Sequence, residues 1–376
     1  MFKRIRQVLS WNKEIKLLQQ KIDELQLYID NLLHEKHEMI LADRKDIAEL
    51  QTYTQSLFHE KHEMILTDRK DIAELRVRTQ NLFHEKHEMI LADRKEICEL
   101  VKNNILQFYK ENRLGDKKDE INFLRENPLS MYPYDWIKEY ENMTVECQQE
   151  DGWLYVIHHE KKIFFPQKYT EGQVKQYYRF LIMEQDKRSP HFYGIKENIL
   201  PQTVFVDVGA AEGLISLEII EKVKEVYIFE SDTAWVNALK KTFKEYENKV
   251  YIIEKFAGDV TAGKKICLCD VLLEKNVYII KIDVEGHEAE VLRGMHGIKM
   301  EQGSCLMICC YHNQKDEEII TNYLKRQEMN YSFAEGYVLS TWGGYQEPYF
   351  RRGICRAYCV SENKILKEAS GMMVGT

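Results

Sequence analysis

An acid and two glycines follow one apolar strand of the sequence in a spacing that suits ligand binding. The stretch VFVDVGAAEGL, residues 204–214, places Asp207 at the end of a strand, followed by Gly209 and Gly213. A dinucleotide-binding turn needs GxGxxG, because the middle glycine lets a pyrophosphate approach a helix N-terminus. Ala211 stands at that middle position. The pattern DxGxxxG therefore predicts a tight turn that brings the backbone close to a small ligand without a phosphate, with Asp207 facing a cationic amine or an ordered water.

A second strand-end acid narrows the class of ligand. Glu230 ends the next apolar run, EVYIFE, where a carboxylate can accept hydrogen bonds from both hydroxyls of a ribose. Together with Asp207 and the glycine turn, this acid suits a nucleoside that carries a zwitterionic amino-acid tail. S-adenosylmethionine is such a ligand, and we expect it as the cofactor. The alternative, in which Asp207 and Glu230 are simple strand-end acids, stays open.

Three carboxylates within six residues form a second cluster. The run IKIDVEGHEAEVLRGM places Asp283, Glu285 and Glu288 at the end of a later strand. Like charges crowded at a strand end are costly unless a function uses them. The alternative for Glu285 and Glu288 is a turn and a helix start, where acids favour the helix dipole and Gly286 permits the turn.

Taken together, DVGAAEG, FES, IKIDVEGHE and VLRG resemble the FkbM family of S-adenosylmethionine-dependent methyltransferases, whose hallmark is IDVEGxE. The likeness covers roughly residues 175–360, including Tyr311-His312 and the run FRRGICRAY. Ala211 stands where many members have Asn, and Ser231 where many have Pro. The resemblance implies a class I methyltransferase fold, a seven-stranded sheet with an antiparallel final hairpin, for which YSFAEGYVLS and ICRAYCV are candidates. It also implies methyl transfer, usually to an oxygen of a sugar or a secondary metabolite.

The resemblance suggests roles for individual residues. Asp283 ends the strand nearest the expected methyl position, so it is the first candidate for the base or for an acid that orients the acceptor hydroxyl. Glu285 and His312 are the alternatives, and a histidine with a near-neutral pKa is chemically the better base. Ala257 follows the third strand, where the family places an adenine-side contact. This reaction requires no metal.

The elements that must position these residues alternate along the chain. Residues 203–310 contain the apolar runs TVFVDV, EVYIFE, KVYIIEKF, NVYIIKID and SCLMICC, with helical patterns between them. Such alternation predicts an α/β fold, a doubly wound Rossmann-like parallel sheet whose ligands bind at the carboxyl ends of the strands. We assign residues 201–362 to this domain and 363–376 to a tail. Residues 115–200 form an accessory cap, in which His191 either closes the substrate mouth or only packs.

Residues 1–114 differ in composition and pattern from the rest of the chain. They contain neither proline nor glycine, and a 25-residue unit occurs in them three times. Seven turns in 25 residues give about 3.57 residues per turn, which predicts a long, gently left-handed coiled coil. A single helix of this length cannot bury its own apolar stripe, so we expect a homo-oligomer. The repeated HEKHE lacks the HExxH order of a zinc helix, and we interpret it as a solvated face.

The composition of the chain limits where in the cell the protein is expected and which classes of partner it can bind. A net charge of −8 argues against a nucleic-acid-binding protein. Nine cysteines, an odd number, indicate reduced thiols in a cytoplasmic protein. No apolar run approaches the length of a membrane span. The basic residues 1–16 could contact the inner face of a membrane, although a simple start of the coil is the favoured interpretation.

We therefore expect an S-adenosylmethionine-dependent O-methyltransferase that acts on a hydroxyl, with a sugar of a glycan or glycoconjugate as the leading acceptor. One alternative is a small-molecule O-methyltransferase of secondary metabolism. The other is a coiled-coil scaffold with an inactive methyltransferase domain.

Overall fold

The computed structural model describes residues 95–112, 117–195, 198–272, 275–341 and 344–359, together with scattered residues between 59 and 92. The chain divides into two compact units, Met1–Leu100 and Val101–Thr376. Each described residue of the first unit is helical. Most of the three repeats, the basic residues 1–16 and the tail 363–376 lie outside the described residues, so the coiled coil stays a prediction.

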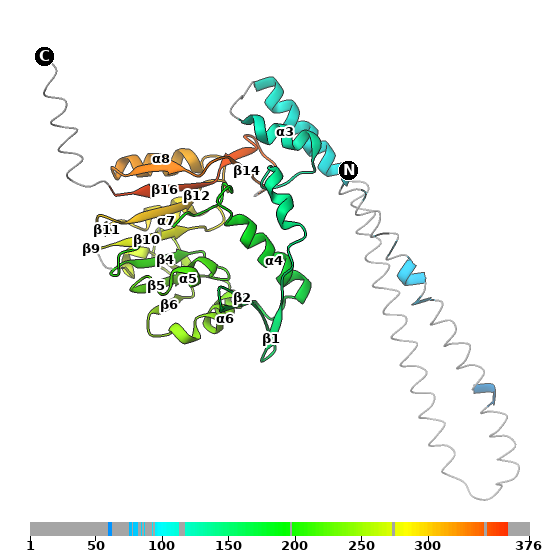
Figure 1. The fold of residues 1–376 in the computed structure, drawn as a ribbon, viewed down its shortest axis with the longest axis horizontal. Coiled ribbons are helices and arrows are strands. Elements are labelled where there is room, and N and C mark those ends of the chain that lie inside the picture. Colours follow the sequence, from blue (N-terminus) through cyan, green and yellow to red (C-terminus); the bar gives the residue numbers. More distant parts are fainter. Residues whose placement is uncertain are drawn as a thin grey trace, which may run out of the picture. The chain divides into compact units, whose positions relative to one another are not determined.

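A seven-stranded sheet in the order β13-β16-β12-β10-β4-β5-β6 forms the centre of the second unit (Figure 1). Its strands are β4 (Val204–Val208), β5 (Glu225–Phe229), β6 (Val250–Ile253), β10 (Tyr278–Ile282), β12 (Cys305–Cys309), β13 (Asn330–Phe333) and β16 (Ile354–Tyr358). Strands β4, β5, β6, β10 and β12 run parallel to one another, whereas β16 is antiparallel to its two neighbours, β12 and β13. The predicted α/β sheet with an antiparallel strand is confirmed. The last two strands are not joined by a simple hairpin, because β14 (Tyr337–Leu339) and β15 (Phe350–Arg352) pair with each other between them in the chain.

Apolar side chains cover both faces of this sheet, as its uninterrupted apolar strands predict. One core lies under α4 (Glu171–Glu184), α5 (Leu214–Ile219) and α6 (Thr233–Thr242), and includes Phe205 and Ile279. The other lies under α7 (Glu288–Arg293) and α8 (Asp316–Arg326), and includes Val206 and Ile280. Neighbouring residues of a strand point to opposite faces, so each central strand is fixed from both sides and its carboxyl end is held in place.

Residues 117–195 form a layer packed on the sheet domain. The strands β1 (Gln148–Glu150), β2 (Trp153–His158) and β3 (Lys161–Phe164) make a small antiparallel sheet. The backbone N–H of Phe164 donates to Thr242 Oγ1 in α6 (3.0 Å), and Lys161 Nζ donates to the carbonyl of Leu217 in α5 (3.2 Å). Because α4 shares the core of the sheet, this layer forms a fixed wall beside the strand ends.

Residues 101–112, which the sequence assigns to the end of the coil, are helical and pack within the second unit. With α3 (Lys118–Glu126) they bury Ile105 and Tyr109 against the β14–β15 pair. The backbone N–H of Phe350 donates to the Tyr109 hydroxyl (2.8 Å), and the two rings stack with centroids 4.9 Å apart. Residues 101–112 are therefore anchored to the sheet domain.

Short elements complete the unit. They are η2 (Asp135–Tyr140), η3 (Lys244–Tyr246), η4 (Leu268–Asp270), β7 (Phe256–Ala257), β8 (Lys265–Ile266), β9 (Lys275–Asn276) and β11 (Lys299–Met300). All nine cysteines are free thiols in the structure. None of the helices in the described part of the chain is long and apolar enough to cross a membrane.

Candidate active site

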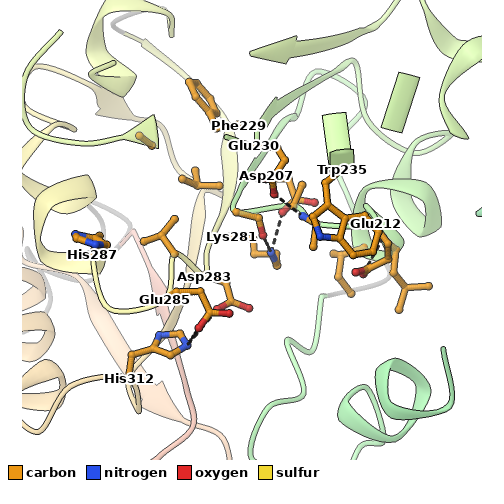
Figure 2. A pocket seen from close by; sticks show the side chains of 18 of the residues that line it. Asp207, Glu212, Phe229, Glu230, Trp235, Lys281, Asp283, Glu285, His287 and His312 are labelled. Atoms are coloured by element: carbon orange, nitrogen blue, oxygen red, sulfur yellow. Dashed lines mark hydrogen bonds and ion pairs between the residues drawn. The ribbon is translucent and has the colours of Figure 1, made fainter. Parts of the chain in front are cut away.

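A cavity of about 900 Å³ lies at the carboxyl ends of β4, β5 and β10. Seven of the eight predicted site residues line it: Asp207, Gly209, Glu230, Ala257, Asp283, Glu285 and His312. The eighth, Gly213, precedes α5 and is not among the lining residues. In Figure 2, Glu230 and Trp235 lie on one side of the view, Glu285 and His312 on the other, and Lys281 between them. Parallel strands end at one edge of a sheet, which explains why residues so far apart in sequence meet here.

Asp207 is bound by the protein itself. The pairing of β4 with β10 places it beside Lys281, whose Nζ donates to Asp207 Oδ1 (2.9 Å) and to the carbonyl of Gly209 (2.7 Å). Ser216 Oγ donates to the other carboxylate oxygen (2.7 Å). Burial alone would lower the pKa of Lys281, but Asp207 and Asp283 raise it above its usual value. The expected cationic partner of Asp207 is therefore a lysine of the chain.

The two turn glycines allow close packing of the protein. Gly209 has φ +78°, and a Cβ built there would lie 1.8 Å from the carbonyl oxygen of Asp283. Gly213 has φ +76°, and its Cβ would lie 2.7 Å from Leu239 Cδ2 and 2.8 Å from Phe243 Cε2. The sequence predicted that these glycines let a ligand approach the backbone. In the structure they let the backbone pack against the end of β10 and against side chains of α6 and the residue after it.

Glu230 is oriented by three backbone N–H groups. Ala211 donates to Oε2 (2.9 Å), and Ser231 and Asp232 donate to Oε1 (2.7 and 2.8 Å). A carboxylate offers about four acceptor sites, two on each oxygen, so Oε2 retains one for a ligand hydroxyl. Trp235 lines the same end of the cavity. This end fits a nucleoside, with one ribose hydroxyl on Glu230 and an aromatic ring beside it.

Asp283 carries a strongly stabilised negative charge. Tyr193 donates its hydroxyl hydrogen to Oδ2 (2.8 Å), and His191 Nε2 lies 3.7 Å from the same oxygen. His312 Nε2 lies 3.6 Å from Oδ1. Burial alone would raise the pKa of Asp283, but His191, Lys281 and His312 together hold it well below its usual range. The lowered pKa favours the ionised carboxylate at neutral pH, which can accept a hydrogen bond from a ligand hydroxyl.

Glu285 occupies a strained turn next to Asp283. Its φ of 55° lies in the left-handed region, which is uncommon for residues other than glycine. Its side chain is 62% exposed, and Oε2 lies 3.5 Å from His312 Nε2. Protein atoms around the carboxylate, followed by the charges of Asp283 and Glu288, raise the pKa of Glu285. Strain of this kind often marks functional sites, and here it directs a second carboxylate to the cavity.

Glu288 and His312 form a buried pair behind these acids. Glu288 begins α7 and is fully buried, and its Oε1 lies 2.7 Å from His312 Nδ1. The same oxygen accepts the backbone N–H of Val284 (3.1 Å). Burial lowers the pKa of His312, but Glu288, Asp283 and Glu285 raise it to about 9. His312 is therefore an imidazolium at neutral pH, suited to stabilise Asp283 rather than to remove a proton.

Three of these side chains lie close enough together to be considered as metal ligands. Asp283, Glu288 and His312 each place one potential ligand atom within 4.8 Å of the other two. However, Glu288 lies at Nδ1 of His312 and Asp283 at Nε2, on different edges of the ring. One ion cannot bind both nitrogens of one imidazole. This geometry therefore favours a chain of polar contacts from Glu288 through His312 to Asp283.

Residues of the accessory layer complete the cavity. Tyr177, Phe180 and Glu184 line it from α4, and His191 and Tyr193 from the loop that follows. Of these residues, only His191 was predicted from the sequence as a possible part of the substrate mouth, and it does line the cavity. Tyr177, Phe180 and Glu184 have a three- to four-residue spacing, which places them along one side of a helix and was the available signal. No comparable spacing pointed to Tyr193. Lys281 was also missed, although a lysine between isoleucines of a buried strand must find a charged partner.

The sheet order, the antiparallel β16 and the site at the strand ends define an α/β protein of the class I methyltransferase type. Residues 146–333, half of the chain, match the family described as methyltransferase FkbM domain. The chain belongs to this family. The match begins just before β1, so the family domain includes part of the accessory layer. Membership implies S-adenosylmethionine as the methyl donor.

Solved structures of low sequence identity are also similar. One is the methyltransferase FkbM from Methylobacillus flagellatus KT, with 20% identity and a TM-score of 0.34, covering 46% of this chain and 50% of that chain. Another is precorrin-6y C5,15-methyltransferase from Geobacter metallireducens GS-15, with 14% identity and a TM-score of 0.32, covering 47% and 87%. This chain thus spans about half the length of the Methylobacillus protein. No curated protein sequence matches it.

Proposed function

We propose that the protein transfers a methyl group from S-adenosylmethionine to a hydroxyl oxygen, and that the acceptor is a sugar of a glycan or glycoconjugate. The observation that supports O-methylation is the position of Asp283 at the end of β10, where Tyr193 orients its carboxylate (2.8 Å) in one cavity with the ribose-type acid Glu230. Family membership supports the methyl donor. A small secondary metabolite is the alternative acceptor.

The residues fit S-adenosylmethionine. Glu230 has an acceptor site for a ribose hydroxyl, Trp235 offers an aromatic face, and Ala257 lines the cavity without a bulky side chain. The carboxylates of the cavity favour a cationic ligand. Bound S-adenosylmethionine supplies a methyl group already activated on a sulfonium, so the protein has only to place the acceptor oxygen and receive its proton.

Asp283 can do both. It accepts a hydrogen bond from the acceptor hydroxyl, which orients an oxygen lone pair for in-line attack. As the carbon–oxygen bond forms and the carbon–sulfur bond breaks, the hydroxyl proton passes to Asp283. A carboxylate of low pKa removes no proton from a free alcohol, but an oxygen that is gaining a methyl group is a much stronger acid. Late proton transfer is therefore favourable, and Glu285 at the mouth can pass the proton to solvent.

Calorimetric titration with S-adenosylmethionine tests the donor site. Wild-type protein should bind it, and Glu230→Ala should bind about 10- to 100-fold more weakly, because a hydrogen bond to a charged group is lost. Glu254→Ala is the matched control, since Glu254 also follows a strand but does not line the cavity. Equal affinity of both variants would contradict the assignment of Glu230.

The acceptor class requires a separate measurement. Cell extract is incubated with the protein and methyl-labelled S-adenosylmethionine, and the products are separated by mass and treated with glycosidases. Label in polymeric, glycosidase-sensitive material supports the glycan acceptor. Label only in low-mass products supports the secondary metabolite instead.

A further inference from the structure

Helix α4 connects the two ends of the cavity. At one end, Tyr177 donates its hydroxyl hydrogen to Glu212 (3.2 Å), and its ring lies against Trp235 with centroids 5.5 Å apart. Glu184 lies seven residues further along the helix, about 10 Å at the usual rise. There it interacts electrostatically with His191 and Asp283. The last two turns of α4 therefore run from the donor end of the cavity to the acid that faces the acceptor.

The Asp283 end combines an aromatic ring with an oriented carboxylate. Phe180 is 38% exposed although it is large and apolar, and it lines the cavity. Its ring stacks on Tyr132, with centroids 5.9 Å apart and an angle of 28°. The Tyr132 hydroxyl donates to Glu184 Oε1 (2.8 Å), so one residue supports both the ring and the carboxylate. A pre-oriented ring beside an acceptor group suits a ligand with a C–H face and hydroxyl donors at its edge.

Cations that could bind an anionic group are already engaged at this end. Lys281 is held by Asp207 and by the carbonyl of Gly209. His191 and His312 both face Asp283. Among the described residues that line the cavity there is no arginine, the side chain that best pairs with carboxylates and phosphates. An acceptor that carried such a group would meet Glu184 and Glu285 instead.

We infer that Phe180 and Glu184 form an acceptor subsite for a neutral, polyhydroxylated ring. The C–H face of the ring lies on Phe180, and one of its hydroxyls donates to Glu184. Uronic acids and sugar phosphates are disfavoured, because Glu184 and Glu285 repel their charge. The other lysines that line the cavity, Lys255 and Lys265, lie next to or opposite β7, beside Ala257, and not at this end. This inference rests on the proposed function and narrows its acceptor class to neutral sugars.

Saturation-transfer NMR on the full chain with S-adenosylhomocysteine tests the subsite. The probes are the methyl glycosides of glucose, galactose and mannose and the three corresponding uronic acids. We expect transfer to at least one neutral glycoside, and at least 10-fold weaker binding of its uronic acid. Phe180→Ala should abolish the transfer and Phe180→Tyr should retain it. Ile157→Ala, at an exposed apolar residue of β2 outside the cavity lining, should leave it unchanged.

Glu184→Gln tests the charge. Removing one negative charge should reduce the preference for the neutral ring over its uronic acid by several-fold. The inference is overturned if no neutral glycoside binds, if a uronic acid binds as tightly as its neutral counterpart, or if Phe180→Ala binds like wild type. Calorimetry with S-adenosylhomocysteine distinguishes failure of the acceptor subsite from failure of the donor site. Protein that binds it but fails these tests retains the proposed donor site, whereas folded protein that does not bind it overturns the proposed function and the subsite together.

Discussion

Among the side chains around Asp283, the hydroxyl of Tyr193 lies closest to its carboxylate, although Tyr193 belongs to the accessory layer. It fixes Asp283 Oδ2 at 2.8 Å, whereas the two imidazoles lie more than 3.5 Å from that carboxylate. Charge and orientation of Asp283 thus have different sources: the histidines and Lys281 supply the positive charge, and the tyrosine supplies the direction.

Tyr193→Phe should therefore impair orientation while leaving the donor site intact. We expect kcat for methyl transfer to fall about 10-fold, the cost of one hydrogen bond to a charged group, with the affinity for S-adenosylmethionine unchanged. Initial-rate kinetics and calorimetry measure the two quantities. Tyr246→Phe is the control, because that hydroxyl contacts the exposed Glu221 on the surface (3.4 Å). A Tyr193→Phe enzyme with wild-type kcat would contradict this role.

The raised pKa of His312 predicts how stability depends on pH. Its pKa rises from 6.5 to about 9 in the folded protein, so its contribution is fully present below about pH 6.5 and is lost as the pH rises through about 9. The difference corresponds to roughly 3 kcal/mol. The stability advantage of wild type over His312→Gln should therefore be large at pH 6 and mostly gone by pH 9.5.

Urea unfolding at a series of pH values measures this difference. His296→Gln serves as the control, because His296 is exposed and lies outside the cavity lining. A wild-type advantage that stays constant from pH 6 to 9.5 would show that the three carboxylates do not stabilise the imidazolium.

At the scale of elements, the site depends on how closely β4 and β10 approach at their carboxyl ends. Gly209→Ala would place a methyl group 1.8 Å from the carbonyl oxygen of Asp283. The backbones of β4 and β10 would have to move apart to relieve this clash. We expect a loss of unfolding free energy of more than about 3 kcal/mol, in the range of severe core changes. Gly263→Ala has a similar positive φ, +58°, but meets nothing within 4 Å.

Comparison with Gly263 separates the cost of the steric contact at residue 209 from the cost of a positive φ. Gly263→Ala should lose only about 1 kcal/mol, the usual cost of a left-handed non-glycine residue. Chemical unfolding of both variants provides the comparison. Equal losses would mean that the positive φ at residue 209, and not the contact with β10, is what requires glycine.

Element types and the position of the site were predictable because they depend on local patterns. The apolar runs and the helical patterns between them in residues 203–310 predicted the strands, and the family resemblance implied a seven-stranded sheet with an antiparallel end. Partners across strands were not predictable, because the pairing of Asp207 with Lys281 depends on register. The packing roles of Gly209 and Gly213 likewise depend on a neighbouring strand and on α6, which no local pattern reveals.

At the scale of the whole molecule, the boundary between the two units falls inside the predicted coil. Residues 101–112 pack on the sheet domain through Ile105 and Tyr109, so a cut at residue 100 leaves the core of the second unit complete. The sequence predicts that the repeats before it carry an apolar seam, and we expect this seam to pair with a second copy of the chain. Oligomerisation and catalysis should therefore separate at this point.

Deletion of residues 1–100 should yield a monomer that binds S-adenosylmethionine with wild-type affinity. Light scattering gives the mass and calorimetry the affinity. Deletion of residues 56–80 is the matched control: it removes one whole 25-residue unit without shifting the seam, so the oligomer should persist while the rod shortens by roughly 37 Å in small-angle scattering. If the protein without residues 1–100 keeps the same number of subunits as the full-length oligomer, its subunits associate through the sheet domain, and the repeats then need another explanation than self-association.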